Sequence, residues 1–190
     1  MVEGQLPAEG QDFHSKVMAS ADRLLSLAEK SKKFDKAMEY NYISGPVDLA
    51  PLLDELCVEY REKYPDATIE TEVGEPQLPG NEMAMKLIFE ELLENALKHN
   101  DGDHPRVKII VAAPGENRSI ISFVDNGPGL SELEQQVILT GEETALQHSL
   151  GLGLWTTSWL VSELSGNMRV TATEGEGTII TIRLPADESI

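Results

Sequence analysis

The spacing of apolar residues predicts a single long helix near the start of the chain. Between 11 and 40, apolar or small residues recur at alternating four- and three-residue steps, with only Asp35 breaking the rule: Val17, Ala21, Leu24, Ala28, Ser31 and Met38. This spacing is typical of one helix of about 30 residues with an apolar stripe along one side. Such a stripe needs a partner, so we expect the helix to pack in a bundle or a coiled coil.

Helical and strand patterns alternate from 47 to 185. Asp48 is expected to cap one helix, and Asn81 to open a second that reaches about Asn100. A third helix is expected at about Leu152–Leu164. Period-two alternation predicts strands at about Ile69–Val73, Val107–Ala113, Ser119–Val124, Met168–Ala172 and Thr178–Leu184. The last four form two hairpins, which favours an α/β sandwich with a largely antiparallel sheet covered by helices on one face.

Breaks in these patterns set the expected domain boundaries. Ser44, Gly45 and Pro46 are typical of an interruption between structured segments. The expected order is a loose tail, the helix, a linker, one domain and a second tail, at 1–10, 11–40, 41–46, 47–185 and 186–190.

Charge and composition narrow the classes of function. The 190 residues include 33 acidic and 15 basic side chains, a formal net charge of -18. A surface this acidic repels nucleic acid and anionic lipid. We therefore expect neither as a partner. With no apolar run near 18 residues and no signal-peptide pattern, we expect a cytoplasmic protein. The charge suits either an ordinary acidic protein or adaptation to a very salty cytoplasm.

Polar residues share one face of the helix that reaches Asn100. Glu91 and Asn95 are one turn apart, and Lys98 and His99 follow about one turn later. An amide oxygen can coordinate Mg²⁺, an ammonium can meet phosphate, and a carboxylate can orient a nucleophile. Taken alone, the same stripe is also typical of a solvated helix face.

Three glycine-containing segments follow along the chain. Asp125-Asn126-Gly127-Pro128-Gly129 ends an apolar strand, where a carboxylate can accept a hydrogen bond from an exocyclic amine. Ser149-Leu150-Gly151-Leu152-Gly153-Leu154 leads into a helix, whose first N–H groups favour phosphate. Gly175-Glu176-Gly177-Thr178 lies in the last hairpin. Each segment alone is also compatible with an ordinary turn or helix start.

The order of these motifs resembles that of the GHKL ATPase superfamily of gyrase, heat-shock chaperone, mismatch-repair and histidine kinase proteins. The resemblance covers about Val47 to Leu184. The run from Asn95 to His99 and the Gly-Leu-Gly-Leu form are similar to the ATP-binding catalytic domain of sensor histidine kinases. The 141–155 stretch, together with the acidic charge, is similar to haloarchaeal kinases. The resemblance implies a Bergerat-type sandwich that transfers the γ-phosphoryl group of ATP to a histidine.

The resemblance also implies a role for each candidate residue. Asn95 is expected to ligate Mg²⁺, and Glu91 occupies the position of the general base or polarising residue. Lys98 is expected to contact the phosphates, and His99 to pack near the nucleoside. Asp125 is expected to bond the adenine amine. Glycines and a threonine complete the expected nucleotide site: Gly127, Gly129, Gly151, Gly153 and Thr178.

The same resemblance implies partners. The helix at 11–40 resembles the second helix of a dimerisation hairpin, and the first helix, with the phospho-accepting histidine, is expected to be missing from this chain. We therefore expect no self-phosphorylation by this chain alone. In a full-length two-component kinase, the expected partners are that phosphoacceptor helix, a second kinase subunit in a homodimer, and a response regulator receiver domain.

Departures from the family pattern leave alternatives open. Ser149 and Leu150 stand where the family usually has a glycine and a small hydroxyl residue, and no lysine or arginine occurs between Arg118 and Arg169. These features favour a degenerate nucleotide-binding or scaffolding module. An anti-sigma-type serine kinase of the same fold is a second alternative. It would phosphorylate serine on a small partner protein and would not need a bundle helix.

Overall fold

The computed structural model describes residues 16–18, 20–21, 28, 32, 45–74, 77–98, 100, 102–115, 118–131 and 151–185. The chain divides into two compact units, Met1–Glu39 and Tyr40–Ile190. The described residues of the first unit are all helical. The two tails, His99 and residues 132–150 lie outside the described residues, so the predictions made for them are untested. No described helix is long and apolar enough to cross a membrane.

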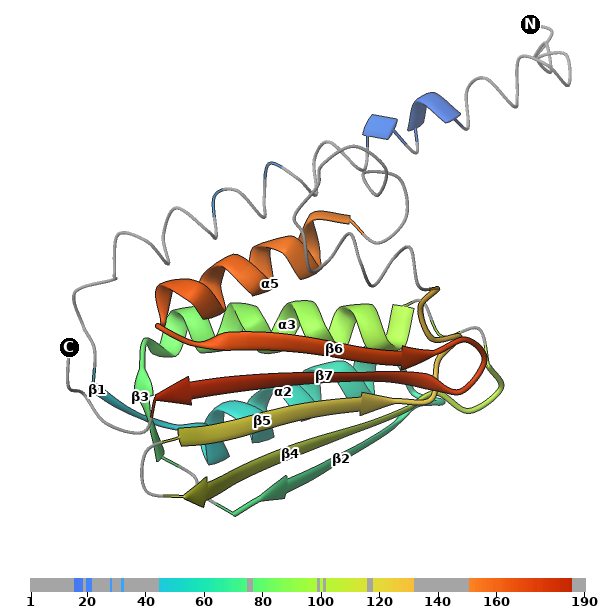
Figure 1. Ribbon diagram of the computed structural model, residues 1–190. Helices are drawn as coiled ribbons and strands as arrows, with labels where there is room; N and C mark the ends of the chain where they lie inside the picture. The colour runs from blue at the N-terminus through green and yellow to red at the C-terminus, as the bar shows by residue number, and fades with distance from the viewer. Residues whose placement is uncertain are drawn as a thin grey trace, which may run out of the picture. The chain divides into compact units, whose positions relative to one another are not determined.

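One mixed sheet of five strands forms the frame of the second unit (Figure 1). The strands lie in the order β2 (Thr68–Val73), β4 (Arg106–Gly115), β5 (Arg118–Asp125), β7 (Gly177–Pro185) and β6 (Asn167–Thr173). β2 pairs with β4 in parallel, and every other neighbouring pair is antiparallel. The largely antiparallel sheet expected from the sequence is therefore confirmed.

Three described helices cover one face of this sheet (Figure 1): α2 (Leu49–Lys63), α3 (Glu82–Lys98) and α5 (Gly151–Glu163). Alternate strand residues such as Ile109 and Ile121 point under the helices and are fully buried. The ring of Phe89 in α3 packs against that of Phe123 in β5 at a tilt of 52°, with ring centroids 5.5 Å apart. The sandwich predicted from the sequence is thus confirmed, because the period-two strands bury one face and expose the other.

The two predicted helix starts carry the expected caps. The Asp48 carboxylate accepts a hydrogen bond from the backbone N–H of Ala50 at 3.1 Å. The Asn81 side-chain oxygen accepts one from the N–H of Ala84 at 3.0 Å. Each cap satisfies a donor that the helix itself cannot pair, so these short polar side chains fix where α2 and α3 begin.

A separate two-stranded sheet was not predicted. β1 (Gly45–Asp48) pairs antiparallel with β3 (Gln77–Gly80). Gly45 and Pro46 therefore belong to the second unit and form a strand, whereas the sequence pattern indicated a linker at 41–46. Proline and glycine are poor central-strand residues, but a two-stranded ribbon tolerates them because each strand pairs along one edge only.

Candidate functional site

Glu91 and Asn95 lie where α3 meets the first turn of α5. A Cβ atom added at Gly153 would overlap the Glu91 carboxylate and stand 3.4 Å from the Asn95 side-chain nitrogen. The two helices therefore approach closely at this point, and the absence of a side chain at Gly153 leaves the Glu91 carboxylate its space. The structure thus brings together residues of two motifs that are 58 positions apart, counted from Asn95 to Gly153.

The Asn95 amide has unused hydrogen-bonding capacity. Its nitrogen is buried and has no hydrogen-bond partner, and no described residue bonds to its oxygen. A buried donor left unpaired costs about 1–3 kcal/mol, so a ligand acceptor such as a phosphate oxygen at this nitrogen recovers that cost, and the amide oxygen stays available to a cation. Among the described residues, no group of three or more His, Cys, Asp or Glu side chains could hold a metal ion. An ion at Asn95 would therefore complete its shell with ligand oxygens and water, which suits Mg²⁺ on a phosphate.

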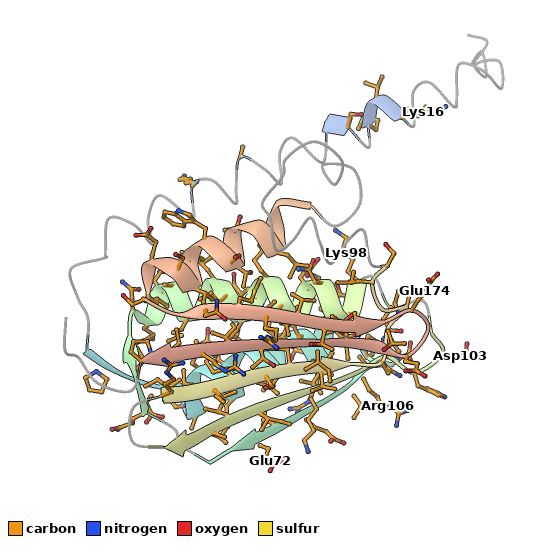
Figure 2. All side chains as sticks on the ribbon, in the orientation of Figure 1. Lys16, Glu72, Lys98, Asp103, Arg106 and Glu174 are labelled. Atoms are coloured by element: carbon orange, nitrogen blue, oxygen red, sulfur yellow. The ribbon has the colours of Figure 1, made fainter. Side chains whose placement is uncertain are left out.

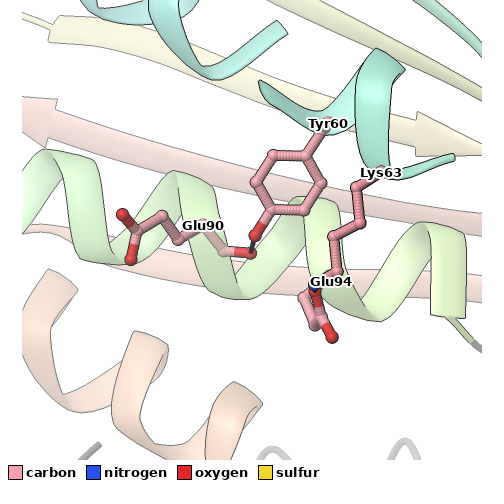
Figure 3. A network of polar contacts seen from close by, with 4 residues as sticks. All are labelled: Tyr60, Lys63, Glu90 and Glu94. Carbon is pink, nitrogen blue, oxygen red and sulfur yellow. Dashed lines mark hydrogen bonds and ion pairs between the residues drawn. The ribbon is translucent and has the colours of Figure 1, made fainter. Parts of the chain in front are cut away.

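A clamp from α2 fixes the part of α3 that carries these residues (Figure 3). The Lys63 ammonium contacts the Glu94 carboxylate at 2.6 Å, and the Tyr60 hydroxyl donates to the backbone oxygen of Glu90 at 3.0 Å. Burial, followed by the nearby Glu94 carboxylate, raises the pKa of the Tyr60 hydroxyl. The hydroxyl therefore stays protonated and remains a donor. Because Glu90 and Glu94 flank Glu91, the clamp holds the site face of α3 toward α5.

Asp125 ends β5 with one carboxylate oxygen fixed by the backbone. Its Oδ1 accepts hydrogen bonds from the N–H groups of Gly127 at 2.8 Å and Thr178 at 3.1 Å. No donor within the described part of the chain bonds to Oδ2, which leaves this atom as an acceptor.

Burial raises the pKa of the Asp125 carboxyl above its ordinary value, and the two backbone hydrogen bonds partly oppose this shift. The folded state therefore favours the neutral carboxyl more than the unfolded chain does. The contribution of Asp125 to stability is present at low pH and is lost as pH rises through its raised pKa. Burial disfavours the charged form of this carboxyl group, and one of its oxygens has no partner among the described residues. Both features are typical of a binding site.

Two glycines allow the last hairpin to close on Asp125. Gly129 has a φ of +74°, and a Cβ there would overlap the backbone oxygen of Thr173. Gly177 has a φ of +116°, and its Cβ would overlap the backbone oxygen of Asp125. Both conformations favour glycine. The resulting approach places the N–H of Thr178 on the Asp125 carboxylate. The sequence analysis placed Gly177 in the last glycine motif but gave it no role of its own.

Asn126 is a second residue that the sequence analysis did not single out. Its Oδ1 accepts hydrogen bonds from the Asn100 side chain at 2.8 Å and from the N–H of Arg106 at 2.7 Å. Its Nδ2 donates to the backbone oxygen of His104 at 3.1 Å. These bonds tie the segment after α3 to the end of β5, beside Asp125. The Asp-Asn-Gly sequence gave only a turn signal, because the partners of Asn126 are distant in the chain.

The predicted residues thus fall into two described groups. Glu91, Asn95 and Gly153 meet between α3 and α5. Asp125 and Thr178 meet between β5 and β7, where a Cβ at Gly127 would stand 3.0 Å from the Asp125 carboxylate, and Gly129 closes on the same hairpin. Lys98 is exposed at the end of α3 (Figure 2), and Gly151 is the first residue of α5.

Comparison with known proteins gives a consistent family. A family model described as histidine kinase-, DNA gyrase B-, and HSP90-like ATPase matches residues 80–188. Sporulation kinase B of Bacillus subtilis is 27% identical over 182 residues, which cover 93% of this chain and 41% of that protein. The chain spans less than half the length of the curated relatives it matches.

Solved structures share the fold. Full-length ShkA in complex with AMPPNP has a TM-score of 0.71 and 23% sequence identity, covering 98% of this chain and 41% of that one. The mycobacterial sensor histidine kinase MprB has a TM-score of 0.65 and 24% identity, covering 75% of this chain and 97% of that one. At these identities, the likeness establishes the architecture.

Proposed function

Because this chain belongs to the family of histidine kinase-, DNA gyrase B- and HSP90-like ATPases, we propose that it is the ATP-binding catalytic domain of a sensor histidine kinase. The observation that carries the proposal is Asp125, with one oxygen fixed by backbone N–H groups and the other available to a base. Sensor kinases among the relatives favour histidine as the acceptor. No comparison or described contact favours the serine kinase or the scaffolding alternative over this proposal.

In this proposal the adenine lies at the end of β5. Asp125 Oδ2 accepts a hydrogen bond from the exocyclic amine, while Thr178 holds the carboxylate in place. Gly127 and Gly129 shape the pocket beside Asp125, and His99 packs near the nucleoside. The acceptor geometry is supported by the two N–H donors that occupy only Oδ1.

The phosphates lie toward α5. The N–H groups of Gly151 and Gly153, in its first turn, favour negative charge there, and Lys98 reaches the phosphates from the end of α3. Asn95 holds Mg²⁺, which neutralises phosphate charge when bound. Glu91 polarises or deprotonates the accepting histidine. Positioning and electrostatics, with no covalent step on this domain, then carry the transfer.

The proposed partners follow from that reaction. A phosphoacceptor helix of the same kinase presents the histidine, a second subunit completes a homodimer, and a response regulator receiver domain takes the phosphoryl group onward. We place this activity in the cytoplasm. The net charge of -18 disfavours nucleic acid and anionic membranes as partners.

We expect this chain to bind ATP without labelling itself, and to become labelled when a phosphoacceptor helix is joined to its N-terminus. Transfer needs an imidazole in line with the γ-phosphate, and none of the four histidines has the sequence context of an acceptor. Incubation with γ-labelled ATP and magnesium tests this. Acid-labile, base-stable label only on the extended chain supports the proposal. Such label on the 190-residue chain itself, or no ATP binding by either, contradicts it.

We also propose that the acidic charge is an adaptation to a very salty cytoplasm. Potassium chloride at molar concentration screens repulsion among 33 acidic side chains, which outnumber the 15 basic ones more than twofold. The thermal midpoint is therefore expected to rise by several degrees between low and molar salt. A midpoint that is flat or falls in melts followed by circular dichroism contradicts the adaptation without affecting the fold.

A further inference from the structure

The sheet face that no described helix of the second unit covers gathers much of the positive charge of that unit. Between 45 and 185 the chain has nine lysines and arginines, and five occupy outward strand positions: Arg106, Lys108, Arg118, Arg169 and Arg183. The outward positions of the same strands hold two carboxylates, Glu70 and Glu72. Five cations and two carboxylates give this surface, here called the basic face, a net charge of +3, on a chain whose total is -18.

Strand register confirms that these residues share one surface. Lys108 pairs with Val124, Val124 with Ile179, and Arg183 with Ile120. Residues directly opposite in antiparallel neighbours lie on the same side of a sheet. The residues between them, such as Ile109, are buried under the helices. In Figure 2, Arg106 and Glu72 project at the margin of this surface.

Three arginines on the basic face are available to a partner. Lys108 contacts Glu72 at 2.8 Å. In contrast, no carboxylate of the described residues pairs with Arg118, Arg169 or Arg183. Guanidinium groups bind carboxylates through two parallel hydrogen bonds, so unpaired arginines are suited to an acidic partner.

The basic face also has an apolar pair. Ile179 is 42% exposed, and its cross-strand partner Val124 is half-buried. Arg169 pairs with Thr181 and so lies diagonal to Ile179. Apolar side chains beside arginines are typical of protein interface cores, which favour arginine and large apolar groups over lysine and glutamate. A purely polyanionic ligand would leave this pair unused.

The charges decide between occupants. Two copies meeting face to face would place arginines against arginines, which disfavours a symmetric dimer through this surface. Nucleic acid and anionic membrane are extended anions that the remaining acidic surface repels. A short protein segment can reach the basic face alone.

We propose that the basic face docks an acidic protein segment that combines carboxylates with an apolar side chain. This goes beyond the proposed function and does not depend on nucleotide binding, because the face lies on the side of the sheet opposite α3 and α5. Arg169 and Arg183 bind the carboxylates, and Ile179 contacts the apolar group.

A random copolymer of glutamate and tyrosine serves as the probe for this surface. Calorimetry at the lowest salt at which the chain is folded is expected to show binding that weakens as salt rises. The double charge reversal R169E/R183E is expected to weaken binding by at least roughly tenfold. The control K16E/K32E makes the same charge change at two exposed lysines of the first unit and is expected to leave binding unchanged. ATP binding is expected to stay the same in both.

Further variants keep the test decisive. If R169E/R183E fails to fold, R169Q/R183Q is expected to give a smaller loss of several-fold. Ile179→Thr is expected to weaken binding of the copolymer but not of plain polyglutamate. No copolymer binding, or equal loss in the control pair, overturns the proposal. Equal or tighter binding of polyglutamate, of duplex DNA or of phosphatidylserine vesicles also overturns it, because the surface would then be a general anion site.

Discussion

Replacing Asp125 with alanine is expected to weaken ATP binding by about tenfold to a hundredfold, while the chain remains folded. The substitution removes the acceptor for the base amine, and hydrogen bonds to a charged group are worth about 1.5–3 kcal/mol. It also leaves the N–H groups of Gly127 and Thr178 without their acceptor. We therefore expect a lower thermal midpoint as well. Calorimetry with ATP and a thermal melt separate these two effects.

Asp125→Asn is the matched control for this prediction. The amide oxygen can still accept from Gly127 and Thr178, so the fold is expected to be preserved. The amide nitrogen then stands where Oδ2 was. As a hydrogen-bond donor it cannot pair with the exocyclic amine of adenine, but it can donate to the carbonyl oxygen of guanine. We expect ATP affinity to fall and the preference to move toward GTP. Wild-type ATP affinity in this variant would contradict the assignment of Asp125 to the base.

The pH dependence of binding provides an independent check. Burial raises the pKa of the Asp125 carboxyl, so it takes up a proton at a less acidic pH than an exposed aspartate. A protonated Oδ2 is a poor acceptor, and ATP affinity is therefore expected to fall as pH drops through this raised pKa. The same fall should be absent in Asp125→Asn. An identical profile in both proteins would show that another group controls the response.

Local signals explain which parts of the fold could be predicted. The starts of α2 and α3 could be predicted from Asp48 and Asn81, because a capping side chain accepts a hydrogen bond from a backbone N–H two or three residues later. Strands from β4 to β7 were found because one face is buried and the other is not. The pairing of β1 with β3 and the parallel register of β2 with β4 join distant segments. Such a pairing cannot be predicted from local patterns in the sequence.

The candidate site divides in the same way. Helical spacing placed Glu91 and Asn95 on one stripe, and the order of motifs selected Asp125 and Gly153 as partners in one function. Two contacts could not be read from spacing: the closeness of Gly153 to Glu91, and the hydrogen bond from Thr178 to Asp125. Both arise from packing between separate elements. That these residues bind ATP and Mg²⁺ remains a prediction.

Gly153→Ala is expected to slow phosphoryl transfer to a joined acceptor helix by at least about tenfold, with little change in stability. The new Cβ would overlap the end of the Glu91 side chain, and that carboxylate can swing aside. A displaced group loses the positioning on which transfer depends. Alanine also favours helix over glycine by about 1 kcal/mol, which offsets the crowding. The transfer rate, the ATP affinity and the thermal midpoint are measured on the same protein.

Two comparisons show whether Glu91 is the cause. Gly177→Ala would instead drive a Cβ into the backbone oxygen of Asp125 at a φ of +116°. Since backbone cannot swing aside, we expect that variant to lose about 3 kcal/mol or more of stability. Glu91→Gln is expected to weaken transfer more than ATP binding. Glu91→Gln already removes the carboxylate, so displacing the side chain at position 91 has little further effect on the transfer rate. Adding Gly153→Ala to Glu91→Gln should therefore slow transfer little further. Losses that multiply in the double variant would mean that Gly153 acts on the phosphates and not through Glu91.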